Sequence, residues 1–545
     1  MGFKVVLTAD RGSFTTYSGI STLGYVACMP ARLVPRLLMN SVFTPPSKVI
    51  GGVEAEVAPY ALRKVEASLL KQGIDSIAVV PPEYIEKAVD ASTKVVGISV
   101  HDPLGLSPVS FKLTMLFGGG PSWTARFFEE LGEKIIKLKK KFNFKVFVGG
   151  PATWQVELER PDWVDTIFYG EAELDLPQLV LKILNGETPP RAASGRNPKV
   201  SEIPVIAKPT RFGEVQVTRG CPRGCQFCSI TPETFRTIPL DDVKHEVSLN
   251  IAHGQRSIEL LTDDILLYGS QRLRTNHAAV VNLFEEVKKL GAEQIYFPHI
   301  SAPAVLESPK TVEAIGEIAE YDKYRSEAPV VGLESGSERI IAKYMSGKPF
   351  PWKPEDWKSV ILNATPIMND AFITPCYTMT IGYQDETDED VSQSIDLVTS
   401  IIDNKLRAWI FPLPVIPMGT SRIRHNPFPV LEKLPKKYWE LLYIAWKYDL
   451  KITREMMPEM SKRVENRITS RIVNIMTDKI FSHIEDYFKM LMETNGIGSL
   501  EYSKINLNNV LGVLKSAYWL TRASLSPPAI SDLAHGSNTS SATSQ

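Results

Sequence analysis

Three cysteines stand close together near the middle of the chain, in the line EVQVTRGCPRGCQFCSI. Cys221, Cys225 and Cys228 are separated by three and then two residues, a spacing that suits a compact loop around one iron–sulfur cluster. A [4Fe–4S] cluster usually takes four protein thiolates, and the remaining cysteines, Cys28 and Cys376, are far away in sequence. Three ligands leave one iron open, and an open coordination position is what a catalytic metal needs.

The alternatives are three unrelated thiols or a zinc knuckle. Zinc sites use four ligands, usually as paired Cys-x-x-Cys or Cys/His units, and no second unit follows Cys228. The alternating run at 214–217 predicts a strand just before the loop, and Gly220 and Gly224 permit a tight turn around a bulky group. The pattern therefore favours the cluster.

Size and composition describe an ordinary globular protein. The 545 residues suggest two to four domains, and 43% hydrophobic with 23% charged residues is typical of such chains. A net charge of −1 gives no sign of a nucleic-acid partner. Five cysteines, three of them in one loop, favour a reducing cytoplasm over a disulfide scaffold. The chain opens like a strand rather than a signal peptide, and no apolar run is long enough to span a membrane, although peripheral membrane contact stays open.

Elements that can position a site alternate through the first part of the chain. Four short apolar runs, at 3–8, 76–80, 95–100 and 145–148, are separated by helical patterns at 58–73 and 123–141. This alternation predicts a doubly wound, Rossmann-like parallel sheet in a domain spanning 1–184. Ligands of such sheets bind outside the carboxyl ends of the strands. The residues at those ends include Asp10, His101, Gly149 and Gly150, and the two glycines would let the backbone approach a flat ligand.

A second series of strands and helices follows a predicted linker at 185–210. The expected strands are 214–218, 257–261, 294–297, 330–333, 377–381 and 408–411, which predict a partial (β/α)6 barrel over 211–425. Barrel sites are built from the loops after the strands. A helical region is expected at 426–525, and a polar, disordered tail at 526–545. The whole chain is thus predicted to be α/β with a helical C-terminal region.

The three-cysteine loop, with Phe227 directly before its last cysteine, resembles the cluster loop of the radical S-adenosylmethionine (SAM) superfamily. The loops after four predicted strands also resemble that superfamily, at 261–264, 332–337, 381–387 and 412–420. The resemblance implies that SAM occupies the open iron of a [4Fe–4S] cluster. The cofactor-binding residues it implies in these loops are Asp263, Asp264, Glu334, Ser335, Gly382 and Glu386. For the two aspartates, capping of the next helix is the alternative.

The first domain resembles the cobalamin-binding domain of one branch of this superfamily, through GISVHDPLGLSP (97–108), FVGGPAT (147–153) and FYGEAELDLPQLV (168–180). The resemblance implies cofactor contacts at Gly149 and Gly150. The cobalt-ligating histidine of the Asp-x-His-x-x-Gly pattern is absent after Asp10. Either cobalamin binds without a protein ligand, or only the fold persists.

Two interpretations are open for each of several other residues near these loops. Arg219 and Arg223 would tune the cluster or lie in solvent, and for Arg223 we expect the second. Cys376 would be a hydrogen donor to a radical or a buried small hydrophobe, with the second again expected. His299, at the end of the third barrel strand, is a candidate for shaping the pocket and moving a proton. The segment 105–121 would be a buried helix ending at glycines or a loop that closes on a ligand.

The C-terminal region carries aromatic stripes, one through Tyr438, Leu441, Ala445 and Tyr448, another over 468–476. They would contact a membrane surface or an extended apolar substrate, or pack as core against the barrel, which we expect more.

These observations predict a radical SAM enzyme that activates an unactivated C–H bond. The substrate expected first is a membrane lipid, with ring formation in tetraether lipids as the reaction; the alternative is a cobalamin-dependent C-methyltransferase acting on a metabolite. A non-catalytic electron-transfer or cluster-carrier protein is a third hypothesis. The expected partners are the small-molecule or lipid substrate and a reductant such as ferredoxin or flavodoxin, without nucleic acid.

Overall fold

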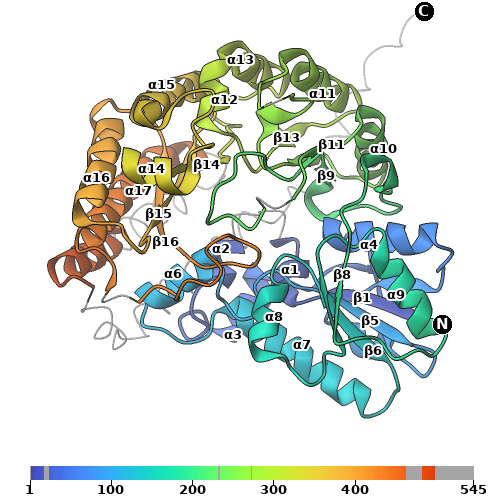
Figure 1. Cartoon of the computed structure of the whole chain (residues 1–545). Helices are drawn as coiled ribbons and strands as arrows, with labels where there is room; N and C mark the ends of the chain where they lie inside the picture. The colour runs from blue at the N-terminus through green and yellow to red at the C-terminus, as the bar shows by residue number, and fades with distance from the viewer. Residues whose placement is uncertain are drawn as a thin grey trace, which may run out of the picture.

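The computed structural model describes residues 2–17, 24–230, 233–271, 273–430, 433–461 and 481–496. Figure 1 shows a parallel sheet with its helices in the lower half and an arc of helices around inner strands in the upper half. The predicted stripe at 468–476 and the predicted tail at 526–545 lie outside the described residues.

The lower unit is a six-stranded parallel sheet in the order β4-β1-β5-β6-β7-β8. Its strands are β1 (Val5–Ala9), β4 (Ile77–Val79), β5 (Val95–Ser99), β6 (Lys145–Gly149), β7 (Thr166–Tyr169) and β8 (Ala192–Ser194). The predicted doubly wound fold is confirmed. The strand order reverses between β1 and β5, and ligands of such sheets bind at that switch point.

Helices cover both faces of this sheet. On one face pack α5 (Ile85–Ala88), α7 (Trp123–Lys139) and α8 (Thr153–Glu159), with Phe128 and Ile135 in a core that includes Val96 and Val148. On the other face lie α4 (Tyr60–Lys71) and α9 (Asp175–Leu184), with Leu69 and Val180 beside Val5 and Phe147. Strands buried on both faces read as continuous apolar runs, and this is why they stand out in the sequence.

Strand β8 lies inside the stretch 185–210 that the sequence indicates as a linker. Ile167 pairs with Ala192 and Tyr169 with Ser194, so the strand extends the sheet at its edge. Its side chains are exposed or half-buried, and an edge strand of this kind carries no apolar alternation for sequence reasoning to detect.

The upper unit is the partial barrel. It consists of two parallel three-stranded sheets, β13-β12-β9 and β14-β15-β16, joined by a bridge between His299 and Val330. The strands are β9 (Glu214–Gln216), β12 (Ser257–Leu261), β13 (Gln294–Tyr296), β14 (Val330–Glu334), β15 (Cys376–Ile381) and β16 (Trp409–Pro414). All six predicted barrel strands are present, and β9 and β16 are left at the open side.

The helices of the arc cover the outside of the barrel: α10 (Leu240–Ala252), α11 (His277–Lys289), α12 (Ala302–Glu307), α13 (Pro309–Ile318), α14 (Glu338–Met345), α15 (Trp357–Asp370) and α16 (Asp388–Asp403). Tyr377 of β15 is fully buried, and its hydroxyl lies 2.7 Å from that of Thr365 on α15. The alternate residues Cys376, Thr378 and Thr380 are half-buried and face the barrel interior.

Helix α17 (Lys437–Ser461) packs against β16 and α16. Tyr438, Leu441, Ala445 and Tyr448 are all buried. The expectation that this stripe is core is confirmed for α17. Within the described ranges, no helix is both long and apolar enough to cross a membrane.

One helix of the first domain, α6 (Pro108–Leu116), packs on β16 at the open side of the barrel. Helix α6 occupies the segment 105–121 and ends before Gly118, whose φ is +81°, so the helical reading of that segment is confirmed.

Candidate active site

The cysteine loop follows β9 and the short strand β10 (Thr218–Arg219), which pairs antiparallel with β11 (Arg236–Thr237). Gly220 has a φ of +80°, and a Cβ there would lie 2.9 Å from the carbonyl oxygen of Thr234. Only glycine therefore lets the chain turn this close to the hairpin. Cys225 is buried, while Cys221 and Cys228 are half-buried.

Burial raises the pKa of all three thiols, that of Cys221 to about 11. They would stay protonated at neutral pH unless a metal displaced the proton. In the part of the chain that the structure describes, no group of three or more His, Cys, Asp and Glu side chains converges on one metal ion.

Arg223, expected in solvent, is buried instead. Its guanidinium donates to Asp264 Oδ2 at 3.2 Å, to Ser301 Oγ at 2.8 Å and to the Lys348 carbonyl oxygen at 2.8 Å. The expectation of a solvated Arg223 is thus wrong. Burial removes its charge from water, and acceptors from three separate segments of the chain keep the guanidinium hydrogen-bonded.

Strand β14 delivers Glu334 to the same end of the barrel. The register with β15 shifts between Gly332 and Glu334, and Glu334 has a φ of +63°, a costly backbone conformation for a non-glycine residue. Its Oε1 accepts a hydrogen bond from Lys348 Nζ at 2.9 Å. The cation of Lys348 also lowers the pKa of the Cys225 and Cys228 thiols against the larger effect of burial. Ser335 is fully buried, and its hydroxyl accepts from the Ser337 N–H at 3.1 Å.

The two aspartates after β12 have different surroundings. Asp264 accepts from the Leu266 N–H at 3.3 Å, which caps a short 3-10 helix, and it also holds Arg223. Asp263 is half-buried, and burial raises its pKa while His299 opposes that rise. His299 Nδ1 lies 3.0 Å from the Thr262 carbonyl oxygen. The Asp264 carboxylate is thus bound within the fold by Arg223 and the Leu266 N–H, whereas the half-buried Asp263 lies beside His299 and the Gly220 backbone.

Gly382 and Glu386 form the loop after β15. Gly382 has a φ of +101°, and its N–H donates to Glu386 Oε2 at 2.5 Å. Burial raises the pKa of Glu386 to about 7. Tyr383 stacks on Tyr344 with ring centroids 4.2 Å apart, and Phe227 of the cysteine loop lies edge-on to Tyr383 at 6.4 Å. The loop is therefore packed directly against the cysteine loop.

Three buried polar atoms at this end of the barrel have no hydrogen-bond partner among the described residues. They are Arg223 Nε, Glu334 Oε2 and Glu386 Oε1. Buried polar groups are nearly always satisfied, so these atoms indicate an absent polar ligand. Three thiols on one loop, the half-buried carboxylate of Asp263 and these orphan atoms fit a cluster that holds a polar, charged cosubstrate such as SAM.

The carboxyl edge of the first sheet faces the cysteine loop. Gly150 has a φ of +116°, and a Cβ there would lie 2.6 Å from the Val100 carbonyl oxygen, whereas one on Gly149 would meet nothing closer than 3.7 Å. Trp154, four residues on, stacks on Phe428 at 6.2 Å. A Cβ placed on Gly419 would lie 3.3 Å from the Trp154 ring and 3.6 Å from Ser229, next to Cys228.

A network of charges that local sequence patterns do not reveal joins the two units. Glu171, after β7, accepts from Arg219 and from Arg236, the latter at 2.5 Å. Glu173 pairs with Arg219 at 2.8 Å. The partners in this network are 48 and 65 residues apart in sequence, and no local sequence pattern links residues so far apart. For this reason neither the network nor Lys348 could be predicted from the sequence.

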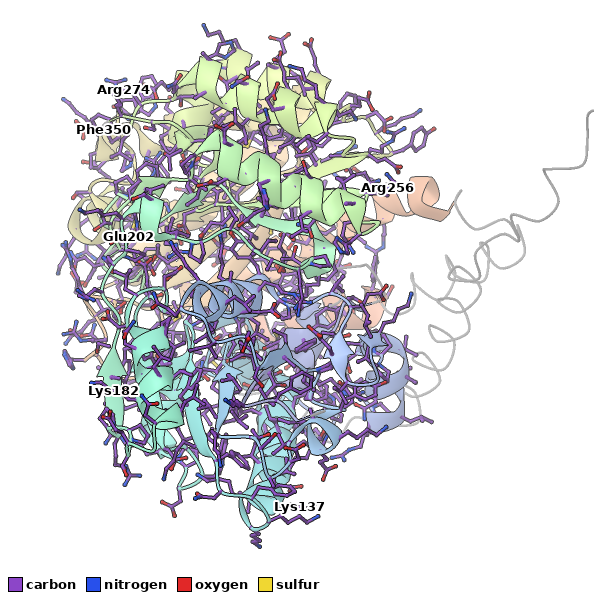
Figure 2. The ribbon with its side chains drawn as sticks, turned by 90° about the vertical axis from the view of Figure 1, so that its right-hand side faces the viewer. Lys137, Lys182, Glu202, Arg256, Arg274 and Phe350 are labelled. Carbon is purple, nitrogen blue, oxygen red and sulfur yellow. The ribbon has the colours of Figure 1, made fainter. Side chains whose placement is uncertain are left out.

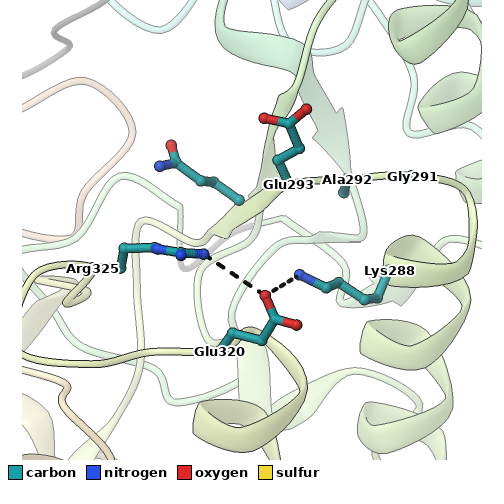
Figure 3. Close-up of a pocket in the computed structure, with 7 residues that line it drawn as sticks. Lys288, Gly291, Ala292, Glu293, Glu320 and Arg325 are labelled. Atoms are coloured by element: carbon teal, nitrogen blue, oxygen red, sulfur yellow. Dashed lines mark hydrogen bonds and ion pairs between the residues drawn. The ribbon is translucent and has the colours of Figure 1, made fainter. Parts of the chain in front are cut away.

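One cavity lies away from this site and another lies beside the cysteine loop. One, drawn in Figure 3, is at the amino end of β13, where Glu320 bridges Lys288 at 2.9 Å and Arg325 at 3.7 Å. The other, lined by Pro222, Phe350 and three further residues, is on the outer side of the cysteine loop. Arg274 lies 5.2 Å from the ring of Phe350, and Figure 2 labels the two close together at one edge of the molecule.

The family model of the Radical SAM superfamily matches residues 215–398. This span contains the cysteine loop and the strands from β9 to β15. The chain carries a radical SAM domain, and the predicted radical SAM enzyme is confirmed.

Curated relatives with a methylthiotransferase name are similar to the chain. It is 23% identical over 357 residues to ribosomal protein uS12 methylthiotransferase RimO of Prosthecochloris aestuarii, covering 64% of this chain and 73% of that protein. It is 26% identical over 292 residues to tRNA-2-methylthio-N(6)-dimethylallyladenosine synthase of Thermotoga petrophila, covering 52% of this chain and 62% of that protein.

Among solved structures, the radical SAM methyltransferase TsrM from Kitasatospora setae, with cobalamin and a [4Fe–4S] cluster bound, superposes with a TM-score of 0.50 at 15% identity. The match covers 78% of this chain and 74% of that one. At this identity the likeness shows a shared fold, which spans both the first domain and the barrel.

Proposed function

We propose that this radical SAM enzyme is a cobalamin-dependent methyltransferase acting on a carbon of a small-molecule substrate. One SAM supplies the methyl group, and the hydrogen that it replaces leaves in the 5′-deoxyadenosine formed from a second SAM. One observation supports this most directly: the carboxyl edge of a doubly wound sheet lies against the cluster loop, through Trp154 beside Gly419 and Ser229. Such an edge is where this fold binds a ligand, so a cofactor held there would stand next to SAM.

In this proposal Cys221, Cys225 and Cys228 hold the cluster, and SAM completes the coordination of its open iron. When bound and reduced, the cluster supplies the electron that cleaves the sulfonium C–S bond. The chain's own residues bind and orient SAM. In this proposal Asp263 accepts a hydrogen bond from the SAM ammonium, and the unpartnered oxygens of Glu334 and Glu386 accept from ribose hydroxyls or the adenine amine. Tyr383 and Phe227 exclude water from the site.

The residues at the edge of the sheet fit a corrinoid bound without a protein ligand to cobalt. Gly12 stands where the Asp-x-His-x-x-Gly pattern has its histidine, and His101 is exposed. The aromatic pair of Trp154 and Phe428 suits a flat, largely apolar ring. The residues Gly149 and Gly150, predicted to bind the cofactor, would contribute backbone contacts there.

Two other reactions receive less support. Methylthio transfer, the reaction in the relatives' names, needs a sulfur atom as well as a methyl group. Only Cys28 and Cys376 remain in this sequence, too few to ligate a second cluster as a sulfur source. Lipid ring formation stays a prediction: Tyr438, Trp439 and Tyr448 of the aromatic helix that suggested an apolar substrate are buried in the core.

The proposal is tested on protein purified without oxygen from cells supplied with cobalamin. Incubation with methyl-deuterated SAM, a reductant and a metabolite extract is expected to give S-adenosylhomocysteine and a labelled product, and Cys225→Ala is expected to give neither. Protein that retains no cobalamin and forms 5′-deoxyadenosine without S-adenosylhomocysteine would exclude methyl transfer and favour ring formation or another C–H reaction. A failure to cleave SAM at all would favour the carrier hypothesis.

A further inference from the structure

Lys112 is a buried lysine on α6, the helix of the first domain that packs on β16 at the open side of the barrel. Only 2% of the residue is exposed. Its Nζ lies 5.9 Å from the ring of Phe411 and 5.8 Å from that of Trp446. Within the described residues, it takes part in no hydrogen bond or salt bridge, so two aromatic rings are the nearest favourable groups for this ammonium.

The carboxylate that could neutralise Lys112 is engaged elsewhere. Asp449 of α17 accepts from the Ile410 N–H at 2.8 Å and so caps the free edge of β16. It acts on Lys112 only through space. Lysine is almost never fully buried without a partner, and burial lowers the pKa of Lys112 to about 7. Without a bound anion, the charged form of Lys112 is therefore energetically unfavourable at this position.

The position of Lys112 indicates where a missing partner would lie. Phe411 pairs with Thr378 in the register of β15 and β16. Ile410 is buried in the core, whereas Phe411 is half-buried on the alternate face of the strand, which faces the barrel interior. Lys112 thus reaches the inner wall of the barrel from the neighbouring domain, at the open side beside β16.

We propose that Lys112 binds a carboxylate of the substrate, and that the rings of Phe411 and Trp446 form an apolar wall beside it. The inference rests on the proposed function, because it assigns the substrate of that same barrel to the class of organic carboxylates. A buried, charge-assisted hydrogen bond to an ammonium is strong and selects against the neutral analogue.

The test compares 3-phenylpropionate with 3-phenylpropionamide, a pair that differs in charge and little in shape, by calorimetric titration of the full chain without SAM or reductant. The wild type is expected to prefer the carboxylate by about tenfold or more. Lys112→Met should lose this preference and Lys112→Arg should keep most of it. Lys447→Met, at an exposed position next to Trp446, should behave like the wild type.

A wild type without a preference, or with no binding of the carboxylate, would overturn the proposal, as would a preference that survives in Lys112→Met. The phosphate of the corrinoid is a second anion that Lys112 could bind, and a titration with hydroxocobalamin tests this alternative. Affinity for hydroxocobalamin is expected to be equal in the wild type and Lys112→Met, and its loss in the variant would assign Lys112 to the cofactor and overturn the proposal. Because none of these titrations needs SAM cleavage, a failure here is distinguishable from a failure of the proposed methyl transfer.

Discussion

At the scale of residues, the site is a set of buried charges held in an incomplete arrangement. Lys348 and Arg223 bring two cations close to the cysteine loop, where they pair with Glu334 and Asp264. An anionic cluster with thiolate ligands would lie within the field of these charges. The local charge should therefore set how easily the cluster accepts an electron.

Replacing Lys348 with Met should make the midpoint potential of the cluster more negative. The reduced cluster carries one more negative charge, and the ammonium that stabilises it would be gone. Glu334→Gln should shift the potential the opposite way, because it removes a nearby anion. A redox titration followed by electron paramagnetic resonance, on protein without SAM, measures both. Lys343→Met, an exposed lysine on α14, is the control, and an unchanged or more positive potential in Lys348→Met would contradict the assignment.

Glu386→Gln should stabilise the protein at high pH only. The folded-state pKa of Glu386 is raised from its ordinary value of 4.5 to about 7 by burial. As pH rises from the lower to the higher value, the unfolded chain loses a proton that the folded chain keeps, so stability falls and the full cost is present above pH 7. The glutamine should remove roughly 1–3 kcal/mol of this cost at about pH 8 and little at about pH 4.5.

Denaturant unfolding at the two pH values measures this difference. Glu389→Gln, at an exposed position in the first turn of α16, is the matched control and should give no gain at either pH. An equal effect of Glu386→Gln at both pH values would show that the Glu386 carboxyl does not titrate in this range.

At the scale of elements, the strand ends of two sheets are fixed against each other by buried ion pairs. Glu171 comes from the loop after β7 and its arginines from β10 and β11, which frame the cysteine loop. The side chains of these residues are about one-tenth exposed, and breaking a buried ion pair leaves an uncompensated charge.

Glu171→Ala should therefore destabilise the protein by roughly 3–5 kcal/mol and speed proteolysis of the crossing at 185–210. Thermal unfolding and limited proteolysis measure the two effects. Glu157→Ala removes an exposed partner of Arg160 and should change stability by at most about 0.5 kcal/mol. If the two variants were equally stable, Glu171 would not hold the domains together.

The helices and strands also show how much of the fold could be predicted from the sequence. Strands such as Val95–Ser99 and Ser257–Leu261 are apolar, short and bounded by turns, so their positions were predicted to within a residue or two. The half-exposed edge strand Ala192–Ser194 was missed because it carries no such pattern. For the site, the spacing of Cys221, Cys225 and Cys228 is local and was readable, whereas the burial of Arg223 depends on Asp264, Ser301 and Lys348. Tertiary contacts of that kind cannot be predicted from spacing.

At the scale of the whole molecule, the fold brings two ligand-binding edges face to face. The carboxyl edge of the first sheet and the strand ends of the barrel meet at Trp154, Gly419 and Ser229, while α6 packs on β16 at the open side. The cysteine loop thus lies where the two domains meet. The account depends above all on SAM cleavage at the three-cysteine cluster.

The most direct measurement of that claim is the amount of 5′-deoxyadenosine formed from SAM by protein reconstituted with iron and sulfide without oxygen, with dithionite as the reductant. The account predicts that the wild type forms 5′-deoxyadenosine and that Cys228→Ser, which removes one cluster ligand, forms none. A wild type that carries its full iron and sulfide content but forms no more 5′-deoxyadenosine than Cys228→Ser would contradict it.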